Sequence, residues 1–304
     1  MKTFVVGSLA LAALLTAAPA PASAQGASAA ETVARSDSAR ADTTPSDPRS
    51  SSITPIHESA SDSLRPVPGS SAARVAELVE QGDAAAARLE PAAALDAYQA
   101  AVGVDPSSYD ALWRAGRTLI DLGELQLRGN EQKDAFNKAL KYAERAIKVN
   151  PSGAQGHLAR AYALDRVALF EGGRTRIRLA REVKSEALRA IDLDPLLDQA
   201  YHILGEWNYR LADMGLVSRL VTKTLLGGMP DDVSWENAAH YFQLAIQADP
   251  ERIDHHLAYA RTLQKLNRKD EARAELGRAL ELPPRDLGDS DRKQEAQDLL
   301  ERLS

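Results

Sequence analysis

The sequence has no cysteine among its 304 residues. This absence excludes disulfide bonds, thiolate metal ligands, cysteine nucleophiles and a lipid-modified N-terminal cysteine. The common catalytic motifs are missing as well, because the sequence contains no Gly-x-Ser-x-Gly elbow, no phosphate-binding loop and no Gly-x-Gly-x-x-Gly turn. Of the function classes that we consider, an enzyme is therefore the least favoured.

The six histidines lack the spacing that is typical of a metal site. None of them forms a His-x3-His or Glu-x-x-His pair that would place two ligands on one face of a helix. The adjacent His255 and His256 point about 100 degrees apart on a helix, which disfavours binding of one ion by both. We predict no metal site and no cofactor.

The chain is acidic, with a formal net charge of -6. Binding to nucleic acid requires a basic surface that neutralises phosphates, so this balance argues against nucleic acid as a partner. A protein partner, or a lipid or other amphiphile, is compatible with the composition.

The start of the chain, over 1–24, has the three parts of an export signal. Lys2 provides a basic residue, residues 4–18 form an apolar run, and Ala22-Ser23-Ala24 resembles a small-x-small cleavage site. The run is too short to span a membrane. A buried N-terminal helix is the alternative, which the Pro-rich sequence that follows disfavours. We therefore expect a signal peptide over 1–24 and an exported protein, either periplasmic or secreted.

Residues 25–71 contain no Phe, Trp or Tyr and are rich in Ser, Thr, Pro, Asp and Ala. A segment of this composition cannot bury enough apolar surface to offset the entropy lost on ordering. We predict a disordered linker over 25–71, followed by one domain over 72–304.

A series of prolines divides this domain, and each proline follows an Ala-rich stretch. An alanine lies shortly before each proline of the series, at a constant spacing, where a small side chain lets two helices approach closely. The last interval, from Pro250 to Pro284, equals the tetratricopeptide period of about 34 residues. The series consists of Pro106, Pro151, Pro195, Pro250 and Pro284, with Ala101, Ala146, Ala190, Ala245 and Ala279 before them.

The residues between the prolines match the two helices of this repeat. Ala94, Tyr98 and Ala101 follow the A-x3-[FY]-x2-A pattern of the second helix, helix B. Gly82 and Gly205 occupy the small position of the first helix, helix A. We predict an all-α, tetratricopeptide-like α-solenoid of about five helix pairs, with a C-terminal helix over about 291–303 that caps the last pair.

The middle repeats are longer than the simple period. Each of the three earlier proline intervals exceeds it by roughly 10 to 20 residues, and the phase places the extra residues between helix A and helix B. In the longest repeat, residues 216–226 have apolar side chains at helical spacing and predict a short amphipathic helix. Such a helix could bind a membrane surface, but we favour its folding back over an apolar wall of the solenoid.

Two stretches of the middle repeats resemble a known family. Glu171-Gly172 precedes the basic stretch Arg174-Thr175-Arg176-Ile177, and Leu204-Gly205-Glu206-Trp207-Asn208-Tyr209 follows in the next repeat. With these stretches the chain resembles the regulator of microtubule dynamics protein family over about residues 75–303. The resemblance implies a non-enzymatic helical adaptor. Animal members are associated with microtubules or organelle contacts, and one kind is linked to phospholipid binding.

The phase of the repeats predicts which side chains of helix A face the concave groove. Arginines next to aromatic rings combine stacking surfaces with fixed hydrogen-bond donors, which is typical of binding hot spots. Packing between helices is an equally weighted alternative for Trp113 and Tyr162. The predicted binding residues are Trp113, Arg117, Tyr162, Arg166, His202, Glu206, Tyr209, Arg210 and Arg261.

A second candidate is the densest basic run of the chain. Arg174, Arg178 and Arg181 share one helical face and could hold an anion near the start of a helix. A solvated, ion-paired surface is the alternative that we favour for them.

These observations predict a non-enzymatic exported adaptor that binds a protein segment in its concave groove. The alternative is a carrier of a lipid or another amphiphile that uses the same groove, closed by the 216–226 helix. A hydrolase without a recognisable motif is the third possibility.

Overall fold

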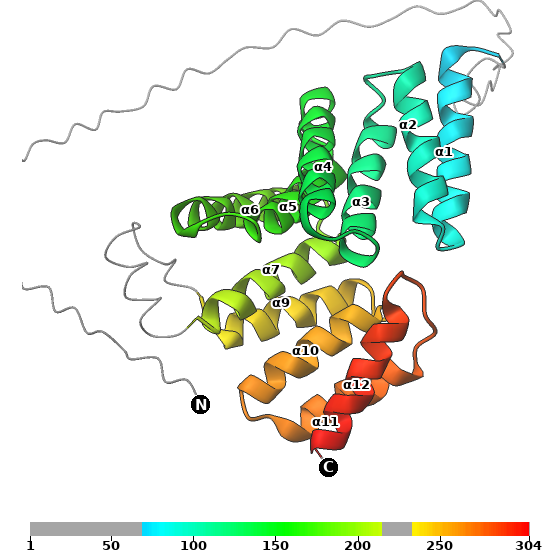
Figure 1. Ribbon diagram of the computed structural model, residues 1–304. Helices are drawn as coiled ribbons and strands as arrows, with labels where there is room; N and C mark the ends of the chain where they lie inside the picture. Colours follow the sequence, from blue (N-terminus) through cyan, green and yellow to red (C-terminus); the bar gives the residue numbers. More distant parts are fainter. Residues whose placement is uncertain (1–68, 215–232, 304) are drawn as a thin grey trace, which may run out of the picture. The chain divides into compact units, whose positions relative to one another are not determined.

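The computed structural model describes residues 69–214 and 233–303 (Figure 1). The predicted signal peptide, nearly all of the predicted linker and the 216–226 segment lie outside these residues, so the interpretations of all three stay predictions. Over the described ranges the chain forms eleven α-helices and no β-strand, and none of these helices is long and apolar enough to cross a membrane. The helices are α1 (Ser71–Ala87), α2 (Pro91–Val104), α3 (Tyr109–Leu125), α4 (Gly129–Val149), α5 (Ala154–Ala168), α6 (Gly173–Leu193), α7 (Asp198–Ala212), α9 (Trp235–Ala248), α10 (Ile253–Lys265), α11 (Lys269–Glu281) and α12 (Asp289–Leu303).

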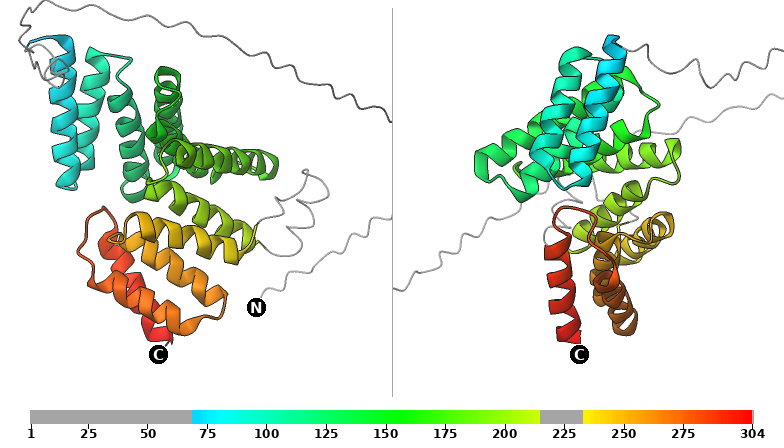
Figure 2. Two further views of the ribbon diagram at one scale, coloured as in Figure 1. Left: turned by 180° about the vertical axis from the view of Figure 1, so that it is seen from behind. Right: turned by 90° about the vertical axis from the view of Figure 1, so that its right-hand side faces the viewer.

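The helices pack as five successive pairs, which confirms the predicted tetratricopeptide-like α-solenoid. The pairs are α1 with α2, α3 with α4, α5 with α6, α7 with α9, and α10 with α11. The first helix of each pair also contacts the first helix of the next, so that α1, α3, α5, α7 and α10 form one continuous row. The last helix, α12, packs on α10 and α11 as the predicted cap (Figure 2). We call the row of first helices the helix-A face.

Small side chains determine how closely the helices of a pair approach. The five alanines that precede the proline series are all completely buried. Gly82, Gly123 and Gly205 lie against the rings of Tyr98, Phe136 and Phe242, and a Cβ atom at these glycines would lie 2.3, 2.4 and 2.6 Å from the nearest ring carbon. Only glycine leaves room for an aromatic ring at such a distance, so each of these pairs depends on the residue types at both positions.

A recurring hydrogen bond ties the start of helix A to the preceding turn. The residue six positions after each middle proline contacts the carbonyl oxygen of that proline at 3.0 Å. These residues are His157, Tyr201 and His256, and the two histidines also contact Glu186 and Glu275 of the paired helix B at 2.6 Å. His157 and His256 therefore have a structural role in the repeat.

The extra residues of the middle repeats do not lie where the sequence phase places them. The loops 126–128 and 169–172 between the paired helices are short, and the additional residues lengthen helix B instead: α4 and α6 each contain 21 residues. The cause is visible in α4, where the buried residues Ala135 and Phe136 extend the buried stripe of helix B by a further turn before Ala139. In the fourth repeat, residues 213–234 separate α7 from α9, and most of them lie outside the described residues.

Candidate binding site

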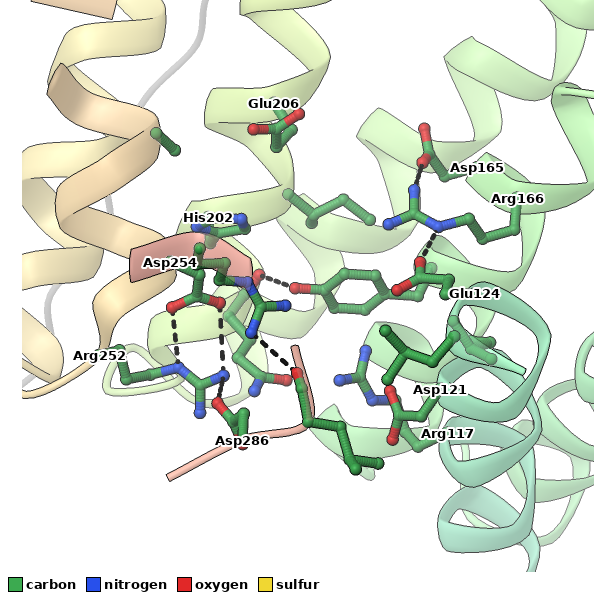
Figure 3. A pocket seen from close by; sticks show the side chains of 18 of the residues that line it. Arg117, Asp121, Glu124, Asp165, Arg166, His202, Glu206, Arg252, Asp254 and Asp286 are labelled. Atoms are coloured by element: carbon green, nitrogen blue, oxygen red, sulfur yellow. Dashed lines mark hydrogen bonds and ion pairs between the residues drawn. The ribbon is translucent and has the colours of Figure 1, made fainter. Parts of the chain in front are cut away.

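A pocket of about 380 Å³ lies on the helix-A face (Figure 3). Its walls come from α3, α5, α7 and α10, and the turn between α1 and α2, the loop 282–288 and the start of α12 complete the lining. Apolar side chains such as Ile120, Ile203 and Leu257 form part of the lining. The charged lining consists of seven arginines, at positions 117, 166, 210, 252, 261, 285 and 292, and six acids, Asp121, Glu124, Asp165, Glu206, Asp254 and Asp286.

Seven of the nine groove residues that the sequence predicts lie together in this pocket. They come from α3, α5, α7 and α10, because one side of each helix in the row faces the same space. The seven are Arg117, Tyr162, Arg166, His202, Glu206, Arg210 and Arg261.

The other two predicted residues, Trp113 and Tyr209, do not line the pocket. Trp113 lies one turn before Arg117, where α3 packs against α1 and α2, and its Nε1 donates a hydrogen bond to Asp110 at 3.2 Å. Tyr209 packs against the core between α9 and α10, with the ammonium of Lys265 5.8 Å from its ring centroid. Both rings therefore pack against neighbouring helices, and their part in partner binding stays a prediction.

The basic run lies on α6, a helix B, and none of Arg174, Arg178 and Arg181 lines the pocket. All three side chains are exposed. Arg178 forms an ion pair with Glu182 one turn further along α6. The anion site proposed for this run stays a prediction.

One side of the pocket is held together by ion pairs among α3, α5 and α7. Figure 3 shows Arg166 between Glu124 and Asp165, and it forms an ion pair with each of them. Arg210 contacts the two oxygens of Asp165 at 2.6 and 3.0 Å. Burial would lower the pKa of Arg166, but the charges of Asp165 and Glu124 raise it, so the guanidinium stays charged. The network links three repeats across the pocket wall.

The opposite side is centred on Arg252, which precedes α10. Its guanidinium lies 2.6 Å from Asp286, 3.3 Å from Asp254 and 3.5 Å from Asp198. Asp286 reaches the pocket because its loop is fixed by Asp289, whose carboxylate accepts hydrogen bonds of 2.8 Å from the backbone N–H groups of residues 285 and 286. The phase of helix A could not identify Arg252 or Asp286, because neither residue lies on a helix A.

Three charged side chains of the lining have no ion pair within 4.0 Å among the described residues: Arg117, Asp121 and Glu206. The guanidinium of Arg117 lies 4.1 Å from the ring centroid of Tyr162. Burial raises the pKa of Tyr162 to about 12, against the opposing charge of Arg117, so this phenol is neutral at physiological pH. Burial also raises the pKa of Asp121. The pocket thus presents one cation and two acidic groups that are available to a ligand.

A cluster of histidine and aspartate lies where α7 meets α10. The Nδ1 atoms of His202 and His255 are 3.0 Å apart, and their rings stack with centroids 4.9 Å apart. His255 also contacts Asp254 through Nδ1, at 3.2 Å, and Asp198 through Nε2, at 3.0 Å. Within the described part of the chain, His202, Asp254 and His255 are the one group whose donor atoms lie close enough to hold a metal ion, all within 4.8 Å of one another.

The surroundings shift the pKa values of the two histidines in opposite directions. Burial lowers the pKa of His202 to about 3, so its ring is neutral at physiological pH. Burial would also lower the pKa of His255, but its hydrogen bonds with Asp198 and Asp254 raise it. Burial would raise the pKa of Asp254, but His202, His255 and Arg252 lower it well below its usual range.

The five stacked pairs define a tetratricopeptide-like repeat protein, a class of scaffold that presents an extended face to partners. A solved structure with this arrangement is a thermophilic tetratricopeptide-repeat protein from Thermus thermophilus, with a TM-score of 0.56 and 19% identity over 73% of this chain and 98% of that one. Residues 73–304 match the family Regulator of microtubule dynamics protein 1-3, and the chain belongs to this family.

Curated relatives agree with this assignment. Regulator of microtubule dynamics protein 1 of Pongo abelii is 32% identical over 197 residues, which are 64% of this chain and 62% of the relative. The protein 3 of Rattus norvegicus is 29% identical over 178 residues, 58% of this chain and 38% of the relative. The chain thus spans about 62% of the length of the most similar of these relatives.

The family membership overturns the predicted location. The relatives are animal regulators of microtubule dynamics, which are neither periplasmic nor secreted, so the prediction of an exported protein is wrong. The prediction depended on the triplet Ala22-Ser23-Ala24 after an apolar run. In an Ala-rich segment such triplets arise from composition alone, which makes the pattern a weak indicator of cleavage.

Proposed function

We propose that this protein is a non-enzymatic adaptor that binds a segment of a partner protein in the pocket on the helix-A face. The pocket carries the proposal because all five helix pairs contribute to its lining. A repeat protein uses such a row of first helices to present one extended surface. The residues that we assign to partner binding are Arg117, Tyr162, Arg166, His202, Glu206, Arg210 and Arg261.

The size of the pocket favours a short segment. A volume of about 380 Å³ lies near the lower end of the range for ligand sites. It accommodates a few side chains of an extended segment, rather than a folded domain. Ile120, Ile203 and Leu257 would cover an apolar side chain of that segment.

The charges of the pocket favour a polar segment with groups of both signs. The ion pairs of Arg166 and Arg252 hold the walls in place before a partner arrives, which reduces the entropy lost on binding. Arg117 would pair with a carboxylate of the partner, while Glu206 would accept from a lysine, an arginine or a backbone N–H. A peptide backbone with mixed side chains satisfies these groups.

A lipid or another amphiphile is the less favoured occupant. Its apolar chain would remove charged lining groups from water without offering them hydrogen-bond partners, which is costly. The 216–226 segment, which was expected to close the groove in that case, lies outside the described residues. The same pocket argues against an enzyme, since most of the acids that line it form ion pairs with arginines.

The proposal is tested with peptides selected from a random displayed library against the full chain. The affinity of a selected peptide is then measured by fluorescence anisotropy for the wild type and for Arg117→Ala and Glu206→Gln. We expect at least tenfold weaker binding for each variant, or about 1.4 kcal/mol. Circular dichroism confirms that the helical content is unchanged.

Arg178→Ala is the matched control, because it removes an exposed arginine of α6 that lies outside the pocket. It should bind the peptide as the wild type does. The proposal would be contradicted if Arg117→Ala and Glu206→Gln bound the peptide with the same affinity as the wild type. Native mass spectrometry of the purified chain tests the alternative, since a retained lipid that is lost in Arg117→Ala would show that an amphiphile occupies the pocket.

A further inference from the structure

We propose that His202, His255 and Asp254 form a binding site for a divalent transition-metal ion of the zinc class. The site joins α7 to α10 at the edge of the pocket, and two of its members, His202 and Asp254, also line the pocket. This inference does not depend on the proposed adaptor function, because it requires no partner protein.

Two of the three pairs of donor atoms have nearly the spacing that zinc requires, and the third pair, His202 and Asp254, lies within 4.8 Å. The two Nδ1 atoms lie 3.0 Å apart, and the Nδ1 atom of His255 lies 3.2 Å from Oδ1 of Asp254. In a tetrahedral site with bonds of about 2.0 to 2.2 Å, neighbouring donors are roughly 3.3 Å apart. Movement of the side chains to this spacing would place the three atoms around an ion. Two imidazole nitrogens at this distance share one hydrogen, and the ion would replace it.

The surroundings of His255 match those of a metal-binding histidine. Its second nitrogen, Nε2, lies 3.0 Å from Oδ2 of Asp198, and the ring is completely buried. A carboxylate on the far nitrogen fixes the tautomer and directs the other nitrogen to the metal, which is the usual outer support of a zinc-bound histidine. Asp198 would supply that support here.

The net formal charge of the cluster favours the binding of a divalent cation. When an ion binds, its histidine ligands are neutral. Three carboxylates, Asp198, Asp254 and Asp286, then surround the single guanidinium of Arg252. The formal charge of these four groups is two negative units. Nearby Arg292 does not change this balance, because it pairs with Asp289 at 2.8 Å. A divalent ion would bring the group to neutrality, and the imidazole donors select zinc-like metals over Mg²⁺ or Ca²⁺.

The neighbouring residue shows that this arrangement is not a general feature of histidines in the repeat. His256, like His157, contacts a proline carbonyl and a glutamate of helix B, and both of its ring nitrogens are occupied by these contacts. His255 instead faces a histidine of another helix. His256 is therefore a matched control of the same residue type and similar burial.

The test uses the full chain without an affinity tag, after treatment with EDTA and dialysis. Zinc chloride is titrated by isothermal calorimetry, and the stoichiometry is measured by native mass spectrometry. We expect one ion per chain. His202→Gln and Asp254→Asn should each weaken zinc binding by more than about a hundredfold, because each removes a direct ligand. Cobalt(II) at the same site should give visible absorption bands that zinc displaces.

His256→Gln should bind zinc as the wild type does, and so should His240→Gln, which changes an exposed histidine. Circular dichroism without metal shows whether each variant is folded. The proposal is overturned if the wild type binds no zinc, or if folded His202→Gln and Asp254→Asn bind it with unchanged affinity. If folded His256→Gln lost zinc binding as strongly as His202→Gln and Asp254→Asn, the ion would not be bound specifically by the proposed ligands, and this site would be refuted.

Discussion

Replacement of Gly205 by alanine tests the contact on which the helix pairs depend. Gly205 lies on α7 directly against the ring of Phe242 on α9. A Cβ atom at this position would lie 2.6, 2.7 and 2.8 Å from three carbons of that ring. Carbon atoms in van der Waals contact are about 3.5 to 4.0 Å apart, so the ring and the added methyl group would have to separate by about 1 Å.

The expected loss of stability follows from two opposing terms. Phe242 is completely buried, so its ring cannot move into solvent, and overpacking of this kind costs up to about 3 kcal/mol. Alanine is favoured over glycine within a helix by about 1 kcal/mol. The free energy of unfolding should therefore fall by about 2 kcal/mol. For a domain of this size the melting temperature should fall by about 4 to 8 °C.

The assay is urea unfolding followed by circular dichroism, together with a thermal melt. Gly277→Ala on α11 is the matched control, because no heavy atom lies within 4 Å of the Cβ position there. It should stabilise the protein by about 0.5 to 1 kcal/mol, through helix propensity alone.

A second substitution tests the physical cause. Phe242→Leu removes the ring that the added methyl group would meet, so Gly205→Ala should cost little or nothing in that background. A coupling energy of about 1 to 3 kcal/mol is expected between the two positions. If the costs of the two substitutions simply add, or if Gly205→Ala is as stable as Gly277→Ala, the close contact is not what makes glycine necessary.

Two further predictions concern the cap and the pocket. Deletion from residue 289 onward should lower the melting temperature or cause aggregation, because α12 covers the cluster around Leu276 and Leu282 and buries Ala296. A soluble monomer with an unchanged melting temperature would contradict this prediction. Tyr162→Phe should change how stability depends on alkaline pH. Since the pKa of Tyr162 is raised to about 12 in the folded protein, the stability linked to this shift is present below about pH 10 and is lost between about pH 10 and pH 12. Urea unfolding should therefore show the wild type losing stability relative to Tyr162→Phe across that interval, and parallel pH profiles would show that the phenol is not buried.

The repeat could be predicted because its signals are local and recur. Each alanine before a proline is buried between paired helices, and Gly205 meets Phe242 as the pattern of helix A and helix B requires. The lengths of the middle repeats were also visible. The structural cause of these lengths could not be predicted, since the proline spacing cannot distinguish an inserted loop from additional turns of α4 and α6.

The pocket could be predicted only in part. Periodicity along helix A identified Arg117, Arg166 and Arg210, because the same side of each first helix faces the same space. It misplaced Trp113, whose turn of α3 meets α1 and α2 instead of the pocket. It could not identify Asp286, which lies in a loop after the last pair.

The order of residues along the chain was sufficient to define a stack of helix pairs, its small-residue contacts and the side of each first helix that faces the pocket. These features depend on the spacing of residue types within single helices, which helix geometry converts into faces. They depend also on the recurrence of helix A and helix B along the chain. The contact between His202 and His255 could not be read in this way, because the two residues lie 53 positions apart in the chain. Their meeting, like the sharing of Asp165 between Arg166 and Arg210, depends on how successive pairs are rotated against each other. That rotation is set by the packing of complete helices, and no single stretch of sequence encodes it.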